Sequence, residues 1–293
     1  MDLMGNPRLR LYAGAALISL SPVWVKLVDV SATTSGFYRV FIGGLALGLY
    51  LVFSRKRLQF SRRIWQLLGL AAIFFALDLW FWHRSIIFIG PGLATLLANF
   101  QVFILMLAGI LVLRQRPSAV QLVAVPLALI GLGMIVGFDW KTLPTDYRLG
   151  IIFGLLTALV YAGYLLTMRF VRKDVEVGMP SREIAVISVG AAIILGFSAL
   201  LEGESLLIPS IGDAAWLVAY GVLSHSLGYI LIVSSLPRVS TTAAGLALLL
   251  QPTLSFVWDV LFFARPMTVI ELAGAGIALC AIYLGSRQSS KEP

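Results

Sequence analysis

Long apolar stretches separated by short polar segments dominate the chain. Ten stretches contain no Asp, Glu, Lys or Arg, namely 11–25, 40–54, 64–77, 85–113, 117–138, 149–168, 184–201, 214–237, 239–258 and 272–286. A helix needs about 20 residues to cross the hydrocarbon core of a membrane, and the shorter stretches reach that length when one flanking charge is included. A transmembrane β-barrel would alternate apolar and polar positions, which the stretch 105–113 does not do. The pattern predicts an all-α integral membrane protein with ten transmembrane helices.

The composition narrows the class of protein further. Hydrophobic residues make up 59% of the 293-residue chain, and charged residues make up 12%, about half of the ~25% usual in soluble domains. A soluble protein of this length cannot cover its surface with so few polar side chains, so a soluble enzyme and a disordered chain are excluded. The single Cys280 and the distant His83 and His225 form no disulfide framework and no metal-ligand pattern. We therefore expect no cofactor and no metal ion.

The distribution of positive charge predicts the orientation. The net charge of +8 comes from residues in short segments between apolar stretches rather than from a basic domain, so the expected partner is the lipid bilayer and not a nucleic acid. With the N-terminus inside, 16 of the 22 Lys and Arg residues fall on the inner side. The positive-inside rule then predicts a multi-pass protein of the cell inner membrane with both termini cytoplasmic. The first stretch lacks a signal-peptide cleavage pattern and is interpreted as a retained helix.

Two parts of the chain are alike at a fixed spacing. The segment 92–99 is followed by Arg116-Pro117, and the similar segment 242–251 is followed by Arg265-Pro266, which puts the two Arg-Pro pairs 149 residues apart. Because each half would contain five helices, the second half enters the membrane from the opposite side. The sequence predicts two inverted-topology five-helix repeats, residues 1–146 and 147–293, a plan common in carriers whose substrate lies between the halves.

The chain resembles the EamA-domain transporters of the drug/metabolite transporter superfamily over nearly its whole length. Aromatic, basic and small residues carry the resemblance: Trp24, Lys26, Tyr38, Arg39, Gly43, Gly44, Gly48, the segments 90–99 and 250–254, and Pro266. Within the superfamily the chain is most similar to the ten-helix, YddG-like exporters of aromatic and neutral amino acids. Many members carry an acidic residue just before the motif that opens the fifth and tenth helices. Arg116 and Arg265 stand there in this chain, so no role of that acid transfers.

The resemblance implies a secondary transporter that exports small amphiphilic metabolites, neutral and aromatic amino acids foremost, by alternating access through a central cavity. The sequence contains no GxxxxGK[ST] segment for nucleotide binding, so transport would use gradients. Three alternatives stay open: an exporter of nucleosides, drugs or other metabolites, a membrane enzyme that modifies lipids, and a membrane scaffold that transports nothing. The enzyme would need clustered nucleophile chemistry, which two isolated histidines do not supply, so a protein that is not an enzyme is expected. The sequence does not decide between a monomer and a homodimer.

Two ionisable residues lie deep in predicted spans, where a charge is costly unless it is hydrated or paired. Asp78 lies in the outer half of the third span and shares a helix face with Trp82. It is a candidate partner for a substrate ammonium group or a proton, and the alternative is a structural pair with Arg39 or His83. Arg39 is a candidate for a substrate carboxylate, and its alternatives are snorkelling outward or pairing with Asp29.

Polar and aromatic side chains at helical spacing complete the predicted site. Thr157, Tyr161, Tyr164 and Met168 share one helix face, as do Gln251, Ser255, Trp258 and Asp259. The predicted substrate-binding residues are Arg39, Asp78, Trp82, Asn99, Tyr161, Tyr164, His225, Tyr229, Gln251 and Trp258. The alternative for each is ordinary helix packing with interhelical hydrogen bonds. Asp259 and Glu271 are expected to be solvated near the outer ends of their helices, and Pro22, Pro126 and Pro252 to kink theirs.

Overall fold

The computed structural model describes residues 6–55, 58–111, 117–137, 140–174, 181–235, 238–239 and 241–286. Arg116, the first residue of one Arg-Pro pair, lies outside these ranges. So do five further positive residues of the orientation analysis: Lys56, Arg57, Arg114, Arg287 and Lys291.

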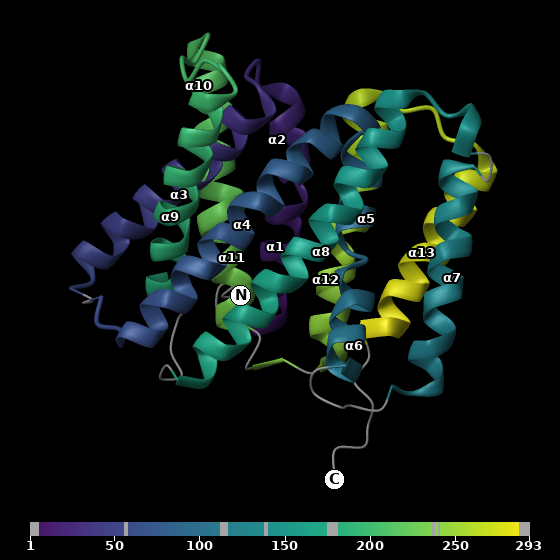
Figure 1. Cartoon of the computed structure of the whole chain (residues 1–293), viewed down its shortest axis with the longest axis horizontal. Helices are drawn as coiled ribbons and strands as arrows, with labels where there is room; N and C mark the ends of the chain where they lie inside the picture. The colour runs from purple at the N-terminus through teal and green to yellow at the C-terminus, as the bar shows by residue number, and fades with distance from the viewer. Residues whose placement is uncertain are drawn as a thin grey trace.

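Every regular element within the described ranges is a helix (Figure 1). The first half contains α1 (Pro7–Ser19), α2 (Ser21–Leu27), α3 (Ala32–Phe53), α4 (Arg62–Ile89), α5 (Pro91–Ala98), α6 (Gln101–Leu111), α7 (Ala119–Val136) and the 3₁₀ turn η1 (Trp140–Thr142). The second half contains α8 (Thr145–Asp174), α9 (Ser181–Leu201), α10 (Ile211–Ala219), the π-helix η2 (Tyr220–Gly228), α11 (Tyr229–Ser235), α12 (Thr241–Phe263) and α13 (Val269–Ser286).

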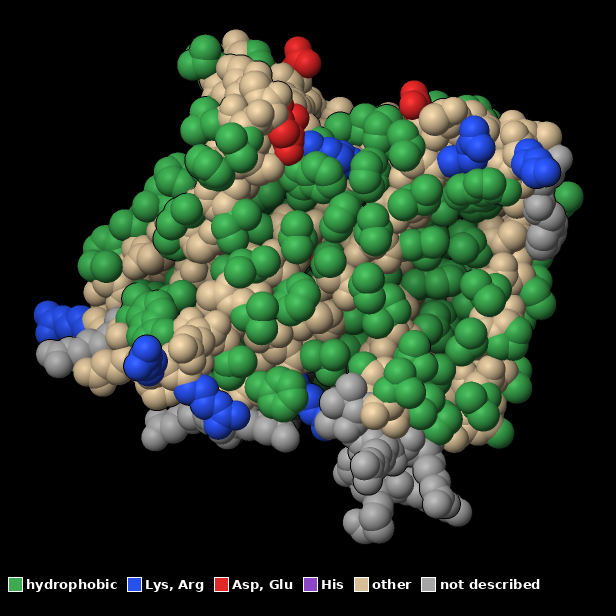
Figure 2. Space-filling model, in the orientation of Figure 1, with side chains coloured by type: hydrophobic (Ala, Val, Ile, Leu, Met, Phe, Trp, Pro, Cys, Tyr) green, Lys and Arg blue, Asp and Glu red, His purple; other side chains and the backbone are tan. Residues whose placement is uncertain are grey.

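Seven helical segments in the described part of the chain are long and apolar enough to cross a membrane: Ala32–Phe53, Arg62–Ile89, Pro91–Leu111, Ala119–Thr142, Thr145–Val171, Ser181–Leu201 and Ile211–Ser235. Two shorter apolar helices, Leu249–Phe263 and Val269–Gly285, follow them. Hydrophobic side chains cover the middle of the visible face, and charged side chains gather toward its upper and lower edges (Figure 2). The described residues therefore confirm the prediction of an all-α membrane protein, with seven helical segments of spanning length.

The helices run between two faces, which we name from Figure 1. The upper face carries the ends of α2, α4 and α9 and the start of α10. The lower face carries the end of α3, the starts of α4 and α7, and the end of α13. Residues 202–210 connect α9 to α10 at the upper face.

Three helical stretches are interrupted: α1–α2, α5–α6 and α10–η2–α11. Pro22, which has no N–H to donate, follows the break between α1 and α2. Asn99 ends α5, and its side-chain amide donates back to the carbonyl of Thr95 over 2.8 Å. The third interruption is the π-helix η2, a geometry that is frequent at functional sites. Pro126 and Pro252 instead lie inside continuous helices, α7 and α12.

A buried acid caps the helix that starts at the upper face after a sharp turn. Gly90, with φ of +84°, ends α4 and leads into α5. The Asp259 carboxylate on α12 accepts the Gly92 N–H over 3.0 Å and lies 3.4 Å from Arg265. Asp259 is only 2% exposed, so the expectation that it is solvated is wrong. Its carboxylate instead satisfies one of the free N–H groups at the start of α5.

The helices pack in two groups. On one side α4 lies against α8 and α9, and α9 also lies against α3. At the other side of the molecule α7 packs on α13 (Figure 1). Between them α1 contacts η2, α11 and α12, and α12 contacts α5.

The α7–α13 contact depends on two glycines. A Cβ on Gly274 would lie 2.7 Å from the Gly131 carbonyl oxygen, and a Cβ on Gly131 would lie 2.7 Å from the Gly274 carbonyl oxygen. Such close backbone approach is how helices in membranes gain packing energy. A Cβ on Gly276, one half-turn further along α13, meets no atom within 4 Å.

We expect Gly274→Ala to destabilise the protein by about 1–3 kcal/mol, because the added methyl group forces two backbones apart. Gly276→Ala is the matched control and should keep or raise the midpoint of thermal unfolding in detergent. Equal midpoints for the two variants would contradict the close contact.

Candidate functional site

A cavity of about 380 Å³ lies among the helices, a size typical of small-molecule sites. It is lined at the helix breaks: Ser19 and Ser21 flank the α1–α2 break, and Asn99 and Gln101 flank the α5–α6 break. Tyr229 directly follows the π-helix η2 and also lines it. Broken helices expose polar groups at mid-membrane depth, and there they are tolerated because they face a cavity.

The cavity lies nearer to the lower face than to the upper one. Its lining includes Ile184, which is three residues from the start of α9, and Tyr283, which is three residues from the end of α13. Both of these helix ends are at the lower face. Toward the upper face, α4 contributes nothing beyond Trp82, seven residues before its end.

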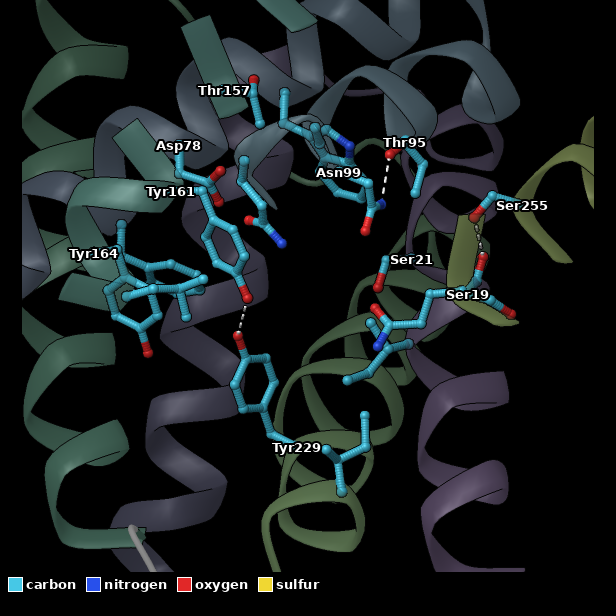
Figure 3. Close-up of a pocket in the computed structure, with 18 of the residues that line it drawn as sticks. Ser19, Ser21, Asp78, Thr95, Asn99, Thr157, Tyr161, Tyr164, Tyr229 and Ser255 are labelled. Carbon is cyan, nitrogen blue, oxygen red and sulfur yellow. Dashed lines mark hydrogen bonds between the residues drawn. The ribbon is translucent and has the colours of Figure 1, made fainter. Parts of the chain in front are cut away.

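Two charged residues of opposite sign line the cavity, and the other lining residues are neutral. Asp78 is 8% exposed, and within the described residues its carboxylate makes no hydrogen bond or ion pair. The predicted alternative of a direct pair with Arg39 or His83 is therefore not what the structure contains. Its side chain points into the cavity beside Tyr161 (Figure 3). A cationic group inside the cavity would meet a carboxyl group that makes no direct bond to any described residue.

Arg39 is held in place by aromatic neighbours. Its guanidinium Nη1 donates to the Tyr220 hydroxyl over 3.0 Å, and its Cζ lies 5.4 Å from the Trp82 ring centroid and 5.1 Å from that of Tyr220. Arg39 is 5% exposed, so it does not snorkel outward as one alternative supposed. This hydrogen bond and the two cation–π contacts hold the guanidinium at the cavity wall.

The hydrogen bonds of Tyr220 and His83 have one consistent direction. His83 Nδ1 lies 2.7 Å from the Leu79 carbonyl oxygen, which can only accept, so Nδ1 carries the proton. His83 Nε2 then accepts from the Tyr220 hydroxyl over 3.1 Å, and the Tyr220 oxygen accepts from Arg39. A neutral histidine from α4 thereby positions the tyrosine that positions Arg39.

Aromatic side chains form one wall of the cavity. Tyr161 and Tyr164 stack with ring centroids 5.6 Å apart, and Tyr164 packs on Phe75 at 5.2 Å. The hydroxyl groups of Tyr161 and Tyr229 are 3.2 Å apart and join α8 to α11 (Figure 3). This wall offers flat apolar surface close to Asp78.

Neutral polar side chains form the opposite wall, which the sequence only partly predicted. Asp78, Tyr161 and Tyr164 lie on one side in Figure 3, and Ser21 and Thr95 lie on the other. Ser21 could have been found from the sequence, because it directly precedes Pro22, where a kink was expected. Thr95 and Gln101 flank Asn99 on a broken helix, and no periodic pattern distinguished them from packing residues.

Eight of the ten predicted site residues line the cavity: Arg39, Asp78, Trp82, Asn99, Tyr161, Tyr164, Tyr229 and Gln251. The other two lie outside its lining. Trp258 donates from Nε1 to the Ser19 hydroxyl over 2.9 Å and is a packing residue. His225 Nε2 bonds the Ser188 hydroxyl over 2.8 Å, and Gly43 packs tightly against its ring. Both contacts depend on how helices cross, which spacing along one helix does not reveal.

A polar network fastens residues 202–210 to α3 and α4 at the upper face. The Glu202 carboxylate accepts from Arg84 Nη2 over 2.6 Å, Trp80 Nε1 over 2.6 Å and the Thr33 hydroxyl over 2.8 Å. Arg84 stacks on Trp80, with its Cζ 3.6 Å from the ring centroid. Nearby, the Ser31 hydroxyl donates to Glu204. We call the group Thr33, Trp80, Arg84 and Glu202 the upper network.

Glu202 stays ionised at neutral pH. Partial burial raises its pKa, but hydrogen bonds from Trp80, Thr33 and Ser198 and the charge of Arg84 lower it more, so the pKa falls from 4.5 to about 2. The folded-state pKa is lowered, so the contribution of Glu202 is present above the ordinary pKa and is lost only as the pH falls toward 2.

Comparisons with known proteins agree with a helical membrane transporter. The model of the EamA-like transporter family matches residues 9–137 and again residues 148–287. A protein of Archaeoglobus fulgidus described as an uncharacterized transporter is 26% identical over 275 residues, which cover 94% of each chain. A solved structure described only as a crystal structure of a protein superposes with a TM-score of 0.67 at 15% identity, covering 96% of each chain, and this shows a shared fold alone.

These matches confirm the expected superfamily and exclude the alternative of a lipid-modifying enzyme. Together with the apolar helices, they make the protein a multi-pass membrane transporter. The chain belongs to the EamA-like transporter family.

Proposed function

We propose that the protein exports neutral amino acids, including aromatic ones, as zwitterions through the central cavity. The observation that carries this proposal is the isolated pair of opposite charges, Asp78 and Arg39, in an otherwise neutral lining. A zwitterion brings one charge of each sign, so its ammonium can meet Asp78 while its carboxylate meets Arg39. A substrate with a further net charge would leave that charge buried without a partner.

The aromatic wall supports substrates with apolar side chains. Tyr161, Tyr164 and Phe75 lie beside Asp78 and can cover a flat or branched side chain while the charged groups hold the zwitterion. A nucleoside or a quaternary drug would use the same surface but would leave Arg39 unpaired. We therefore favour amino acids over these alternatives.

Ten spans arranged as two inverted repeats, residues 1–146 and 147–293, fit the order of the helices. The spans would be α1–α2, α3, α4, α5–α6 and α7 in the first repeat, and α8, α9, α10–η2–α11, α12 and α13 in the second. Under this pairing the contact of α4 with α8 corresponds to that of α1 with α11, and α5 with α8 corresponds to α1 with α12. The contacts of α3 with α9, α5 with α12 and α7 with α13 correspond to themselves. The double match to the family model supports the same division.

The positive charges and the cavity together suggest which state this is. If the lower face is cytoplasmic, as the positive-inside rule predicts, the cavity lies toward the cytoplasm and the upper network closes the outside. Alternating access then requires the upper network to open while the lower ends of the helices close.

Transport in liposomes tests the proposed function. Purified protein should exchange labelled leucine or phenylalanine, and Asp78→Asn should reduce that flux at least tenfold while the protein keeps its unfolding midpoint, because the amide keeps the volume but loses the charge. Glu271→Gln is the matched control, since among the described residues the Glu271 carboxylate accepts hydrogen bonds only from Thr268, the residue before α13. Flux of a nucleoside or a quaternary ammonium compound without flux of any amino acid would overturn the proposal. If adding Arg39→Gln restores the flux of Asp78→Asn, Asp78 only neutralises Arg39 and does not bind the substrate.

Thiol labelling tests the orientation. Cys280→Ser removes the single thiol of the chain, and Gln59→Cys and Pro144→Cys then report on the lower and upper faces. In intact cells a membrane-impermeant maleimide should label the second variant only. Labelling of the Gln59→Cys variant from outside would reverse the topology.

Opening of the upper network can be measured in the thiol-free Cys280→Ser protein. Ala98→Cys puts a thiol on the cavity lining, and Glu202→Gln should raise its labelling rate from outside about fivefold, equivalent to about 1 kcal/mol, the upper range for a partly exposed ion pair. Glu271→Gln serves again as control and should change nothing. An unchanged rate in Glu202→Gln would mean that this network does not hold the outside closed.

A further inference from the structure

The lining of the cavity contains hydrogen-bonding groups without partners. Among the described residues, the Ser21 hydroxyl, the Thr95 hydroxyl and the Gln101 side-chain oxygen are buried and make no hydrogen bond. Ser21 is 1% exposed and Thr95 is 9% exposed, and both line the cavity. A buried polar group without a partner costs about 1–3 kcal/mol, so such a cluster is unfavourable until something bonds it.

Two neighbouring hydroxyl groups already make hydrogen bonds within the protein, unlike those of Ser21 and Thr95. The Ser19 hydroxyl donates to the Ala16 carbonyl over 2.6 Å and accepts from Trp258. The Ser255 hydroxyl donates to the Ser19 carbonyl over 3.2 Å. Turning either of these toward the cavity breaks a hydrogen bond, whereas turning Ser21 or Thr95 about its Cα–Cβ bond breaks none.

The Asn99 side chain supplies a directed acceptor at the same wall. Its Nδ2 donates to the Thr95 carbonyl over 2.8 Å, and a carbonyl can only accept, so the orientation of the amide is fixed. Asn99 Oδ1 then points away from that bond into the cavity (Figure 3). The Gln251 side chain lines the same cavity and makes no hydrogen bond to a described residue.

We propose that Ser21, Thr95 and Asn99 form a subsite for a neutral hydroxyl or carboxamide group on the substrate side chain. The inference rests on the proposed function, because Asp78 and Arg39 are taken to hold the zwitterion while the substrate side chain reaches this wall. A charged side chain finds no counter-charge at this wall. A purely apolar side chain leaves the hydroxyl groups and the amides unpaired, which is the situation in which a polar site discriminates most strongly.

The subsite predicts a ranking among amino acids of equal size. Threonine and valine have nearly the same shape, and so do asparagine and leucine. Threonine should compete with labelled substrate about tenfold better than valine, and asparagine better than leucine, because hydrogen bonding to the buried subsite distinguishes the members of each pair.

The test is competition in proteoliposomes with wild-type protein and three variants. Thr95→Val and Asn99→Leu should bring the threonine-to-valine competition ratio close to one while valine still competes. Thr253→Val is the matched control, because that hydroxyl bonds the Leu249 carbonyl of its own helix over 2.8 Å and is not part of the cavity lining. It should keep the wild-type ratio. The ratio is insensitive to the amount of folded protein, so reduced expression of a variant does not mimic the result.

Each outcome decides the proposal. A wild-type ratio near one overturns the subsite while leaving the proposed function intact. A ratio that stays near ten in both Thr95→Val and Asn99→Leu, or that falls equally in Thr253→Val, also overturns it. Absence of flux for every amino acid overturns the proposed function, and the subsite falls with it.

Discussion

Backbone hydrogen bonding in an apolar surrounding is the constraint on which this structure depends. In a membrane each N–H and C=O group must find its partner within the protein, so continuous helices are the default and every interruption needs a replacement partner. At the α1–α2 break the Ser224 hydroxyl donates to the Leu17 carbonyl, and the Ser255 hydroxyl donates to the Ser19 carbonyl. The interrupted helices are thus bonded to η2 and α12, and the cavity forms where they meet.

The same constraint explains how differently the buried charges are treated. Asp259 accepts the Gly92 N–H and pairs with Arg265, so its charge is used to join α12 to the start of α5. Arg39 makes cation–π contacts with Trp82 and Tyr220 and donates a hydrogen bond to the Tyr220 hydroxyl. Asp78 has no such partner among the described residues and opens onto the cavity. A carboxylate left free beside a cavity is the expected signature of a ligand site rather than of a structural pair.

The contacts also divide the molecule into parts that are fixed to different degrees. The α7–α13 contact brings two glycine backbones together and leaves no room for a Cβ. The upper network joins side chains of α3 and α4 to residues 202–210, and it is partly open to solvent. Backbone packing of the first kind resists movement, whereas side-chain bonds of the second kind can exchange partners with water. A carrier that changes which face is open needs both.

The sequence by itself determined the class of protein, because apolar stretches of membrane-spanning length and a low charge content admit few other structures. Most of the residues that it singled out line the cavity, since residues such as Tyr161 and Tyr164 share a helix face and helical spacing is readable from the chain. Tertiary structure alone decided whether Trp258 faces the cavity or Ser19, and whether Asp259 meets water or the start of α5. It also decided that Asp78 and Arg39 occupy one cavity without bonding each other. Periodicity specifies one helix at a time, whereas these outcomes depend on which helices cross and where they break.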